Sequence, residues 1–242
     1  MSKIFITGSS DGLGLLAATK LIEGGHEVVL HARNMQRAGQ VLKTIPNATE
    51  ILTGDLSNIE EVKILAEKAN SFGKFDALIH NAGVYTAPKK DILNVNVLAP
   101  YTLTSLMEKP ARLVYLSSGM HLSGDVNLEN LRKADITYSD SKLYVVMLAN
   151  AVAREWERVF SNSVNPGWVP TKMGGKGAPD DLQKGWETQV WLTTSNDAGA
   201  QVSGKYFFHQ KPEKYHSDAG NPELQNKFLK TCAEITGIEF PR

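Results

Sequence analysis

Short apolar runs alternate with amphipathic segments along nearly the whole chain, and this alternation constrains the fold more than any other feature. Apolar runs without polar interruption are typical of parallel strands that are buried on both faces of a sheet. Strands that alternate with helices across short connections indicate a parallel sheet with helices packed on both sides. The sequence therefore predicts a three-layer α/β fold, a doubly wound parallel sheet of about seven strands, built as a single domain over residues 1–242.

The periodicity of the apolar residues predicts where these elements lie. The expected strands span residues 3–7, 27–31, 50–53, 75–80, 112–117, 161–164 and 205–208. The expected helices span residues 14–23, 35–44 (ended by Pro46), 60–72, 91–107, 138–160, 179–195 and 222–236. Two stretches with little pattern, 119–137 and 168–179, are expected to be loops at the carboxyl ends of strands, where ligands bind in open α/β sheets.

Composition and charge exclude several classes of partner. The 26 basic residues equal the 26 acidic residues, so no net charge favours nucleic acid or an anionic membrane as a partner. Cys232 is the single cysteine, which rules out an intrachain disulfide and fits a reducing compartment. We see no signal peptide and no stretch that approaches the ~20 apolar residues of a membrane span, and we therefore expect a cytoplasmic protein. The histidines lack metal-ligand spacing, and we predict no metal site.

A glycine-rich turn follows the first expected strand directly, in the sequence Thr7-Gly8-Ser9-Ser10-Asp11-Gly12-Leu13-Gly14. Glycines at such a turn let the backbone approach a pyrophosphate, and the following helix offers free N–H groups and the positive end of its dipole. Glycines alone are weak evidence, but their place between a strand and a helix favours this role. The residues that we expect to bind the phosphates of a dinucleotide are Gly8, Ser10, Asp11, Gly12, Leu13 and Gly14.

The end of the second expected strand bears on which dinucleotide binds. An acidic residue near this point accepts a hydrogen bond from the ribose 2′-hydroxyl of NAD, whereas a basic residue suits the 2′-phosphate of NADP. Arg33 supplies a guanidinium fork here, and no acidic residue stands nearby in the sequence. The sequence therefore favours NADP(H) as the cofactor, with NAD(H) as the alternative.

Two segments contain a tyrosine four residues before a lysine, Tyr138 with Lys142 and Tyr85 with Lys89. On a helix such residues share a face, and the ammonium lowers the pKa of the phenol from its usual value of about 10 toward working pH. Tyr138 opens a long amphipathic helix, whereas a proline disfavours a helix through the Tyr85 segment, which we expect to be a loop. A hydroxyl at the end of the fifth expected strand, on Ser118 or on its rival Ser117, can hold a substrate oxygen for Tyr138. We predict Tyr138 as a general acid/base, assisted by Lys142 and Ser118.

The Thr-Gly-x-x-x-Gly-x-Gly spacing, the Tyr138-x-x-x-Lys142 pair and Ser118 together resemble the short-chain dehydrogenase/reductase family nearly from end to end of the chain. The long stretch between Ser118 and Tyr138 resembles the retinol-dehydrogenase-like branch. The resemblance implies a Rossmann fold with a cofactor half of about residues 1–110 and a catalytic and substrate half of about residues 111–242. The chain departs from the pattern at Asp11, where many NADP-using relatives carry a basic residue.

Further site residues are implied by the resemblance alone. It implies that Asn96 supports a proton relay to Lys142 and that Asp55 hydrogen-bonds the adenine amine. It also implies cofactor contacts from Tyr138 and Lys142 themselves, and from Leu56, Asn81, Ala82, Gly83, Pro166, Gly167, Val169 and Thr171. Relatives often form dimers through the helix that corresponds to residues 138–160, which leaves a homo-oligomer open.

These residues and the resemblance together predict an oxidoreductase that transfers a hydride between NADP(H) and a small-molecule carbonyl or alcohol. The alternative is a non-catalytic NADP(H)-binding redox sensor or scaffold protein. Relatives of that kind usually lack the tyrosine or the lysine, and Tyr138 and Lys142 are both present here.

Overall fold

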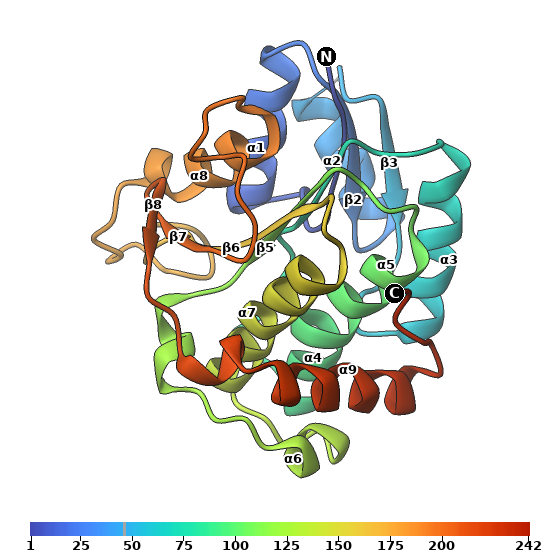
Figure 1. The fold of residues 1–242 in the computed structure, drawn as a ribbon. Helices are drawn as coiled ribbons and strands as arrows, with labels where there is room; N and C mark the ends of the chain where they lie inside the picture. The colour runs from blue at the N-terminus through green and yellow to red at the C-terminus, as the bar shows by residue number, and fades with distance from the viewer. Residues whose placement is uncertain (46) are drawn as a thin grey trace.

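An eight-stranded sheet forms the centre of the computed structural model, which describes residues 1–45 and 47–242 (Figure 1). The strands are β1 (Lys3–Ile6), β2 (Glu27–Ala32), β3 (Glu50–Thr53), β4 (Ala77–His80), β5 (Arg112–Leu116), β6 (Phe160–Asn165), β7 (Tyr206–Phe208) and β8 (Lys211–Glu213). Their order in the sheet is β3-β2-β1-β4-β5-β6-β7-β8. All neighbours pair in parallel except β7 and β8, which are antiparallel. The order reverses between β1 and β4, and ligands bind at such a reversal in open α/β sheets.

Helices cover both faces of the sheet (Figure 1). They are α1 (Gly12–Glu23), α2 (Met35–Thr44), α3 (Ile59–Ser71), α4 (Lys89–Leu93), α5 (Ala99–Leu106), α6 (Leu128–Arg132), α7 (Tyr138–Glu155), α8 (Leu182–Thr194) and α9 (Pro222–Thr236). Three short turns complete the set, the π-helical η1 (Asn94–Leu98) and the 3₁₀-helical η2 (Gly119–Ser123) and η3 (Ser217–Gly220). Helices α1, α2 and α8 lie on one face, whereas α3, α5, α7 and α9 lie on the other.

The core has two halves because successive side chains of a strand point to opposite faces. In β1, Phe5 packs into the cluster with α3, α5 and α7, whereas Ile4 and Ile6 pack into the cluster with α1 and α8. All three side chains are fully buried. Burial on both faces explains why the strands lack polar alternation. The predicted three-layer, doubly wound Rossmann fold is confirmed.

The structure differs from the expected elements in four main places. The helix expected over residues 138–160 ends at Glu155 as α7, and Phe160 already begins β6. The expected helix 91–107 forms as α4, η1 and α5 in succession, and Pro100 lies in the first turn of α5, where a missing N–H costs little. The expected loop 119–137 contains η2 and α6. Strand β8 was not expected, since it is short and contains Pro212, which an edge strand tolerates. Pro46, predicted to end the second helix, lies outside the described residues.

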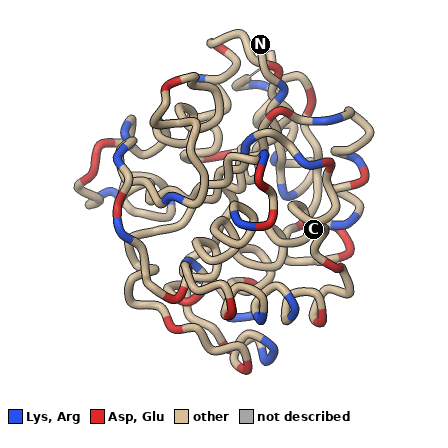
Figure 2. The backbone as a smooth tube through the Cα atoms, viewed as in Figure 1, with Lys and Arg blue, Asp and Glu red and all other residues tan. Residues whose placement is uncertain are grey.

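The surface carries both signs of charge. Basic and acidic residues are interspersed along the backbone in the view of Figure 2. Among the helices of the described residues, none combines the length and the apolar character that crossing a bilayer requires.

Candidate active site

The glycine-rich turn after β1 packs directly against the turn that follows β4. Gly8 and Gly12 have φ values of 64° and 56°, in the left-handed region that favours glycine. A Cβ atom on Gly8 would lie 2.8 Å from the Cα of Ala82. Asn81 fixes the same junction, because its Nδ2 donates to the carbonyl oxygens of Thr7 (3.0 Å) and Gly8 (3.1 Å). The turn therefore needs glycine for its shape, and it leaves first-turn amides of α1 as donors for a phosphate.

His31 of β2 contacts the glycine-rich turn, although nothing in the sequence pattern assigned it a role. Its Nδ1 accepts from the N–H of Gly8 (3.0 Å), and its Nε2 donates to the carbonyl oxygen of Gly54 (2.8 Å). Burial lowers the pKa of His31 below its ordinary value, which favours the neutral ring that these two contacts require. A histidine within a buried apolar strand is the signal that could have found it.

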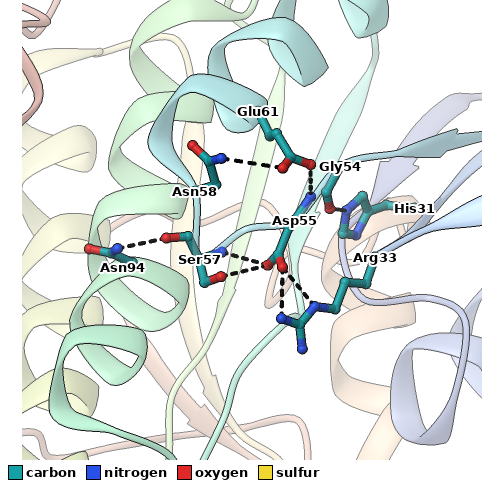
Figure 3. Close-up of polar contacts among 8 residues, drawn as sticks. All are labelled: His31, Arg33, Gly54, Asp55, Ser57, Asn58, Glu61 and Asn94. Atoms are coloured by element: carbon teal, nitrogen blue, oxygen red, sulfur yellow. Dashed lines mark hydrogen bonds and ion pairs between the residues drawn. The ribbon is translucent and has the colours of Figure 1, made fainter.

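Arg33 and Asp55 form an ion pair at the carboxyl ends of β2 and β3 (Figure 3). Two guanidinium nitrogens of Arg33, Nε and NH2, donate to Oδ2 of Asp55 at 2.8 and 2.7 Å. Oδ1 of Asp55 accepts from the amide (2.9 Å) and the hydroxyl (2.8 Å) of Ser57. Burial raises the pKa of Asp55, but the hydrogen bonds from Ser57 and Arg33 outweigh it, and the pKa lies below its ordinary value. The Arg33 side chain is 63% exposed, so its guanidinium remains accessible to an anionic ligand.

Tyr138, Lys142 and Ser118 come together where β5 ends beside the first turn of α7. Thr137 begins the helix with a capping box, in which its hydroxyl accepts from the amide of Asp140 and the Asp140 carboxylate accepts from the amide of Thr137. Nζ of Lys142, one turn along, lies 5.5 Å from the centre of the Tyr138 ring. The Ser118 hydroxyl lies near enough to the Tyr138 phenol to lower its pKa. The three predicted catalytic groups thus share one small region.

Lys142 carries its amine into the protein. Only 4% of the residue is exposed, and Nζ donates to the carbonyl oxygen of Leu116 (2.8 Å). Burial lowers the pKa of Lys142 to about 8, so that the ammonium form still predominates at neutral pH. Ser117, the neighbour of the predicted serine, donates its hydroxyl to the carbonyl oxygen of Lys142 (2.8 Å). Ser117 therefore braces α7 on β5, whereas Ser118 interacts with the phenol.

The pKa of Tyr138 runs opposite to the sequence-based expectation. Burial raises it to about 12, while the nearby Ser118 hydroxyl lowers it and the neighbouring Tyr85 raises it further. Loss of phenolate hydration is the largest influence on this pKa, and the predicted lowering by Lys142 is wrong. The phenol is therefore protonated at neutral pH, in the form that can donate a proton.

Asn96 links the turn after β4 to α7. Its Oδ1 accepts from the amide of Val84 (2.8 Å), and its Nδ2 donates to the carbonyl oxygen of Val84 (3.0 Å) and to the hydroxyl of Ser141 (3.0 Å). A Cβ atom on Gly83 would lie 3.3 Å from Nζ of Lys142. Asn96 and Gly83 therefore shape the space around the lysine.

Tyr85 is a site residue that sequence reasoning missed. It lies in the irregular segment before α4, as the proline of that segment predicted. Its ring nevertheless meets Tyr138 edge-on, with centroids 4.7 Å apart and planes at 84°, and the residue is 47% exposed. The contact joins two segments that are distant in the sequence, so no local sequence pattern predicts it. Tyr85 therefore forms a partly exposed edge beside the phenol.

The segment after β6 lies over the glycine-rich turn. A Cβ atom on Gly12 would lie 3.9 Å from Cγ2 of Thr171. Nζ of Lys172 pairs with the carboxylate of Asp11, the residue that caps α1. Thr171 therefore stands where a phosphate on this turn would come within its reach.

Some of the remaining predicted cofactor residues can offer only backbone atoms to a ligand. The side chains of Leu56 and Val169 are buried in the protein. Gly14 has no room for a side chain, since a Cβ atom would lie 2.6 Å from the carbonyl oxygen of Gly8. The other predicted residues of this group are partly exposed: Ser10, Leu13, Pro166 and Gly167. Within residues 1–45 and 47–242, no three His, Cys, Asp or Glu side chains gather to hold a metal ion.

Family membership follows from the comparison of the chain with known proteins. The family model described as short chain dehydrogenase matches residues 2–181. Because the match covers most of the chain, this protein belongs to the short-chain dehydrogenase family.

Individual relatives indicate which branch of the family the chain resembles. The chain is 45% identical over 254 aligned residues to an uncharacterized oxidoreductase of Emericella nidulans, with 100% of this chain and 99% of the relative covered. It is 25% identical to human retinol dehydrogenase 13, with 98% of this chain and 85% of that protein covered. A solved short chain dehydrogenase from Shigella flexneri, complexed with NADP, matches with a TM-score of 0.68 and 25% identity over 86% of this chain and 97% of that one. The predicted family and its retinol-dehydrogenase-like branch are confirmed, and the protein is an oxidoreductase.

Proposed function

We propose that this protein transfers a hydride between NADP(H) and a small-molecule carbonyl or alcohol, with Tyr138 moving the proton to or from the oxygen. The observation that carries the proposal is that the Ser118 hydroxyl, the Tyr138 phenol and the buried amine of Lys142 gather where β5 ends beside α7. Two neighbouring hydroxyl groups can both donate a hydrogen bond to one substrate oxygen. The Tyr138 phenol can then donate a proton to this oxygen, and the ammonium of Lys142 lies near the phenol.

The residues around the glycine-rich turn fit a dinucleotide. Gly8 packs where no side chain could, and α1 directs its amino-terminal end at the same point. A bound nicotinamide would supply or accept the hydride. We propose NADP(H) over NAD(H) because the Arg33 guanidinium, although one of its edges pairs with Asp55, is largely exposed and carries a charge suited to a 2′-phosphate. The NADP complex of the Shigella flexneri relative agrees with this choice.

The proton steps follow from the positions of the side chains. In the reducing direction, the hydroxyls of Ser118 and Tyr138 donate to the carbonyl oxygen and polarise it. Tyr138 gives its proton to this oxygen as the new C–H bond forms, and the ammonium of Lys142 stabilises the phenolate that remains. Asn96 holds the backbone of Val84 near the lysine. In the oxidising direction the same groups act in reverse.

The pKa of about 12 for Tyr138 bears on the direction of the reaction. At neutral pH the phenol carries the proton that carbonyl reduction consumes, whereas alcohol oxidation needs the phenolate. We therefore propose that carbonyl reduction predominates at neutral pH and that oxidation accelerates as the pH rises.

Cofactor choice is tested by Arg33→Ala. Losing a charge-assisted hydrogen bond to the 2′-phosphate, worth about 1.5–3 kcal/mol, raises the Kd for NADPH roughly 10- to 100-fold and leaves the Kd for NADH nearly unchanged. Arg33→Lys, which keeps the charge and loses the fork, falls between. Titrations of both reduced cofactors by fluorescence measure the effect. Equal weakening of NADPH and NADH would show that Arg33 does not read the 2′-phosphate.

The enzyme and the sensor hypotheses are separated by a substrate panel. The purified protein is mixed with NADPH and a series of aldehydes and ketones, and with NADP⁺ and a series of alcohols, while the absorbance of the reduced nicotinamide is followed. An enzyme turns over at least one of these compounds. Tight NADPH binding with no turnover across the panel would favour a redox sensor or scaffold.

A further inference from the structure

We propose that His121 is a positioning residue that holds the backbone carbonyl of Ser118 and so aims the Ser118 hydroxyl at the substrate oxygen. The inference rests on the proposed function of Ser118. His121 belongs to η2, within the stretch 119–137 that the sequence predicts as a substrate-side loop. Its exposed fraction is 0%, however, so it acts from inside the protein.

His121 holds Ser118 through two contacts to one atom. Nδ1 of His121 lies 2.8 Å from the carbonyl oxygen of Ser118, and the backbone amide of His121 donates to the same oxygen at 3.1 Å. The Ser118 hydroxyl in turn accepts from the amide of Met120 at 3.2 Å. Ser118 thus has its backbone fixed by the imidazole and its side chain oriented by the turn that the imidazole stabilises.

The far side of the imidazole is anchored to a distant part of the chain. Nε2 of His121 accepts from the backbone amide of His216, just before η3, at 3.3 Å. The ring also packs against Tyr206 of β7, with centroids 4.5 Å apart. His121 therefore connects the predicted catalytic serine to the carboxyl-terminal segment.

These two partners determine the protonation state of the ring. The carbonyl oxygen of Ser118 can only accept, and the amide of His216 can only donate, so the ring must be neutral with its proton on Nδ1. Burial and the neighbouring His216 both lower the pKa of His121, which favours the neutral ring. A histidine that only filled space would have no such pair of contacts, so this tautomer indicates that His121 holds Ser118.

The consequence for turnover follows from the place of Ser118. It stands at the junction between β5 and η2, where the sheet no longer fixes the backbone. Misplacing a group that positions a substrate by about 1 Å can lower turnover about 100-fold. Loss of the imidazole contact should therefore lower kcat more than it changes cofactor binding.

Two variants of similar polarity separate the two contacts of the ring. The amide nitrogen of His121→Asn can reach the position of Nδ1 and donate to Ser118, but the side chain is too short for His216. The amide oxygen of His121→Gln can reach the position of Nε2 and accept from His216, but the contact with Ser118 is lost. We expect kcat to stay within about 3-fold in His121→Asn and to fall about 10- to 100-fold in His121→Gln, with the Kd for NADPH unchanged in both. Equal kcat values for the two variants would overturn the proposal.

Two controls keep the test decisive. Nuclear magnetic resonance of isotope-labelled histidine in the unaltered protein reports the tautomer even if a variant fails to fold. A proton on Nδ1 supports the proposal, and a proton on Nε2 overturns it. Ser118→Ala tests the underlying role of the serine. Full turnover in Ser118→Ala would refute that part of the proposed function, whereas a loss there with full turnover in His121→Gln would refute the role of His121 alone.

Discussion

The buried amine of Lys142 lowers the stability of the folded protein, although the proposed function requires it. Its pKa falls from 10.5 to about 8 on burial, so below pH 8 the folded protein holds a charge that the unfolded chain accommodates more easily. A shift of this size corresponds to a cost of roughly 3 kcal/mol at neutral pH. The unfolded chain binds more protons between about pH 8 and 10.5, so the free energy of unfolding rises with pH across that window.

We therefore predict that Lys142→Met stabilises the fold while it abolishes turnover. Methionine has a similar length without the charge, and the lost hydrogen bond to the Leu116 carbonyl offsets part of the gain. Urea unfolding at pH 7 should show a gain of about 1–2 kcal/mol. The gain should shrink at pH 10, where the unaltered lysine is largely neutral in the folded protein. A variant less stable than the original protein at pH 7 would contradict this account of the buried amine.

The positions of the predicted site residues in the fold could be predicted from sequence more readily than their pKa values. Tyr138, Lys142 and Ser118 come from recognisable positions at the ends of a strand and the start of a helix, and the fold brings them together. The pKa of Tyr138 could not be predicted, because it depends on burial by segments far away in the chain. His121 and Tyr85 were missed as contacts for the same reason.

At the scale of one element, the ion pair between Asp11 and Lys172 is expected to restrain the segment after β6. Asp11→Asn removes the negative charge that pairs with Lys172, and asparagine can still cap α1. An exposed ion pair contributes about 0–1 kcal/mol, so we expect an unchanged melting temperature but about 2- to 5-fold faster trypsin cleavage after Lys172 and Lys176. High salt should produce the same acceleration in the unaltered protein, since it screens the pair. Identical cleavage rates at low salt would show that the pair does not restrain this segment.

Most strands and helices could be predicted because apolar periodicity and turn residues mark them locally. The parts that could not be predicted lack such marks. Strand β8 consists of Lys211, Pro212 and Glu213, which carry no apolar signal and owe their extended form to pairing with β7. The π-helical turn η1 lies within an ordinary apolar helix pattern, and its wider winding becomes visible only in the coordinates.

At the scale of the whole molecule, the strand order explains why one site gathers residues from across the sequence. The carboxyl ends of β1, β4 and β5 are adjacent in the sheet, and they carry Gly8, Gly83 and Ser118. Helix α7 then packs beside β5 and adds Tyr138 and Lys142. We propose that the chain works as one domain, in which residues 1–110 bind the cofactor and residues 111–242 act on the substrate.

The most direct test of this account is the turnover of Tyr138→Phe with a carbonyl substrate found in the panel. The variant keeps the ring that packs against Tyr85 and lacks only the hydroxyl. We predict an unchanged Kd for NADPH and a fall in kcat of at least ~100-fold, the scale that removing a general acid produces. A variant that binds NADPH normally and reduces the carbonyl at nearly the original rate would contradict the central claim that Tyr138 moves the proton.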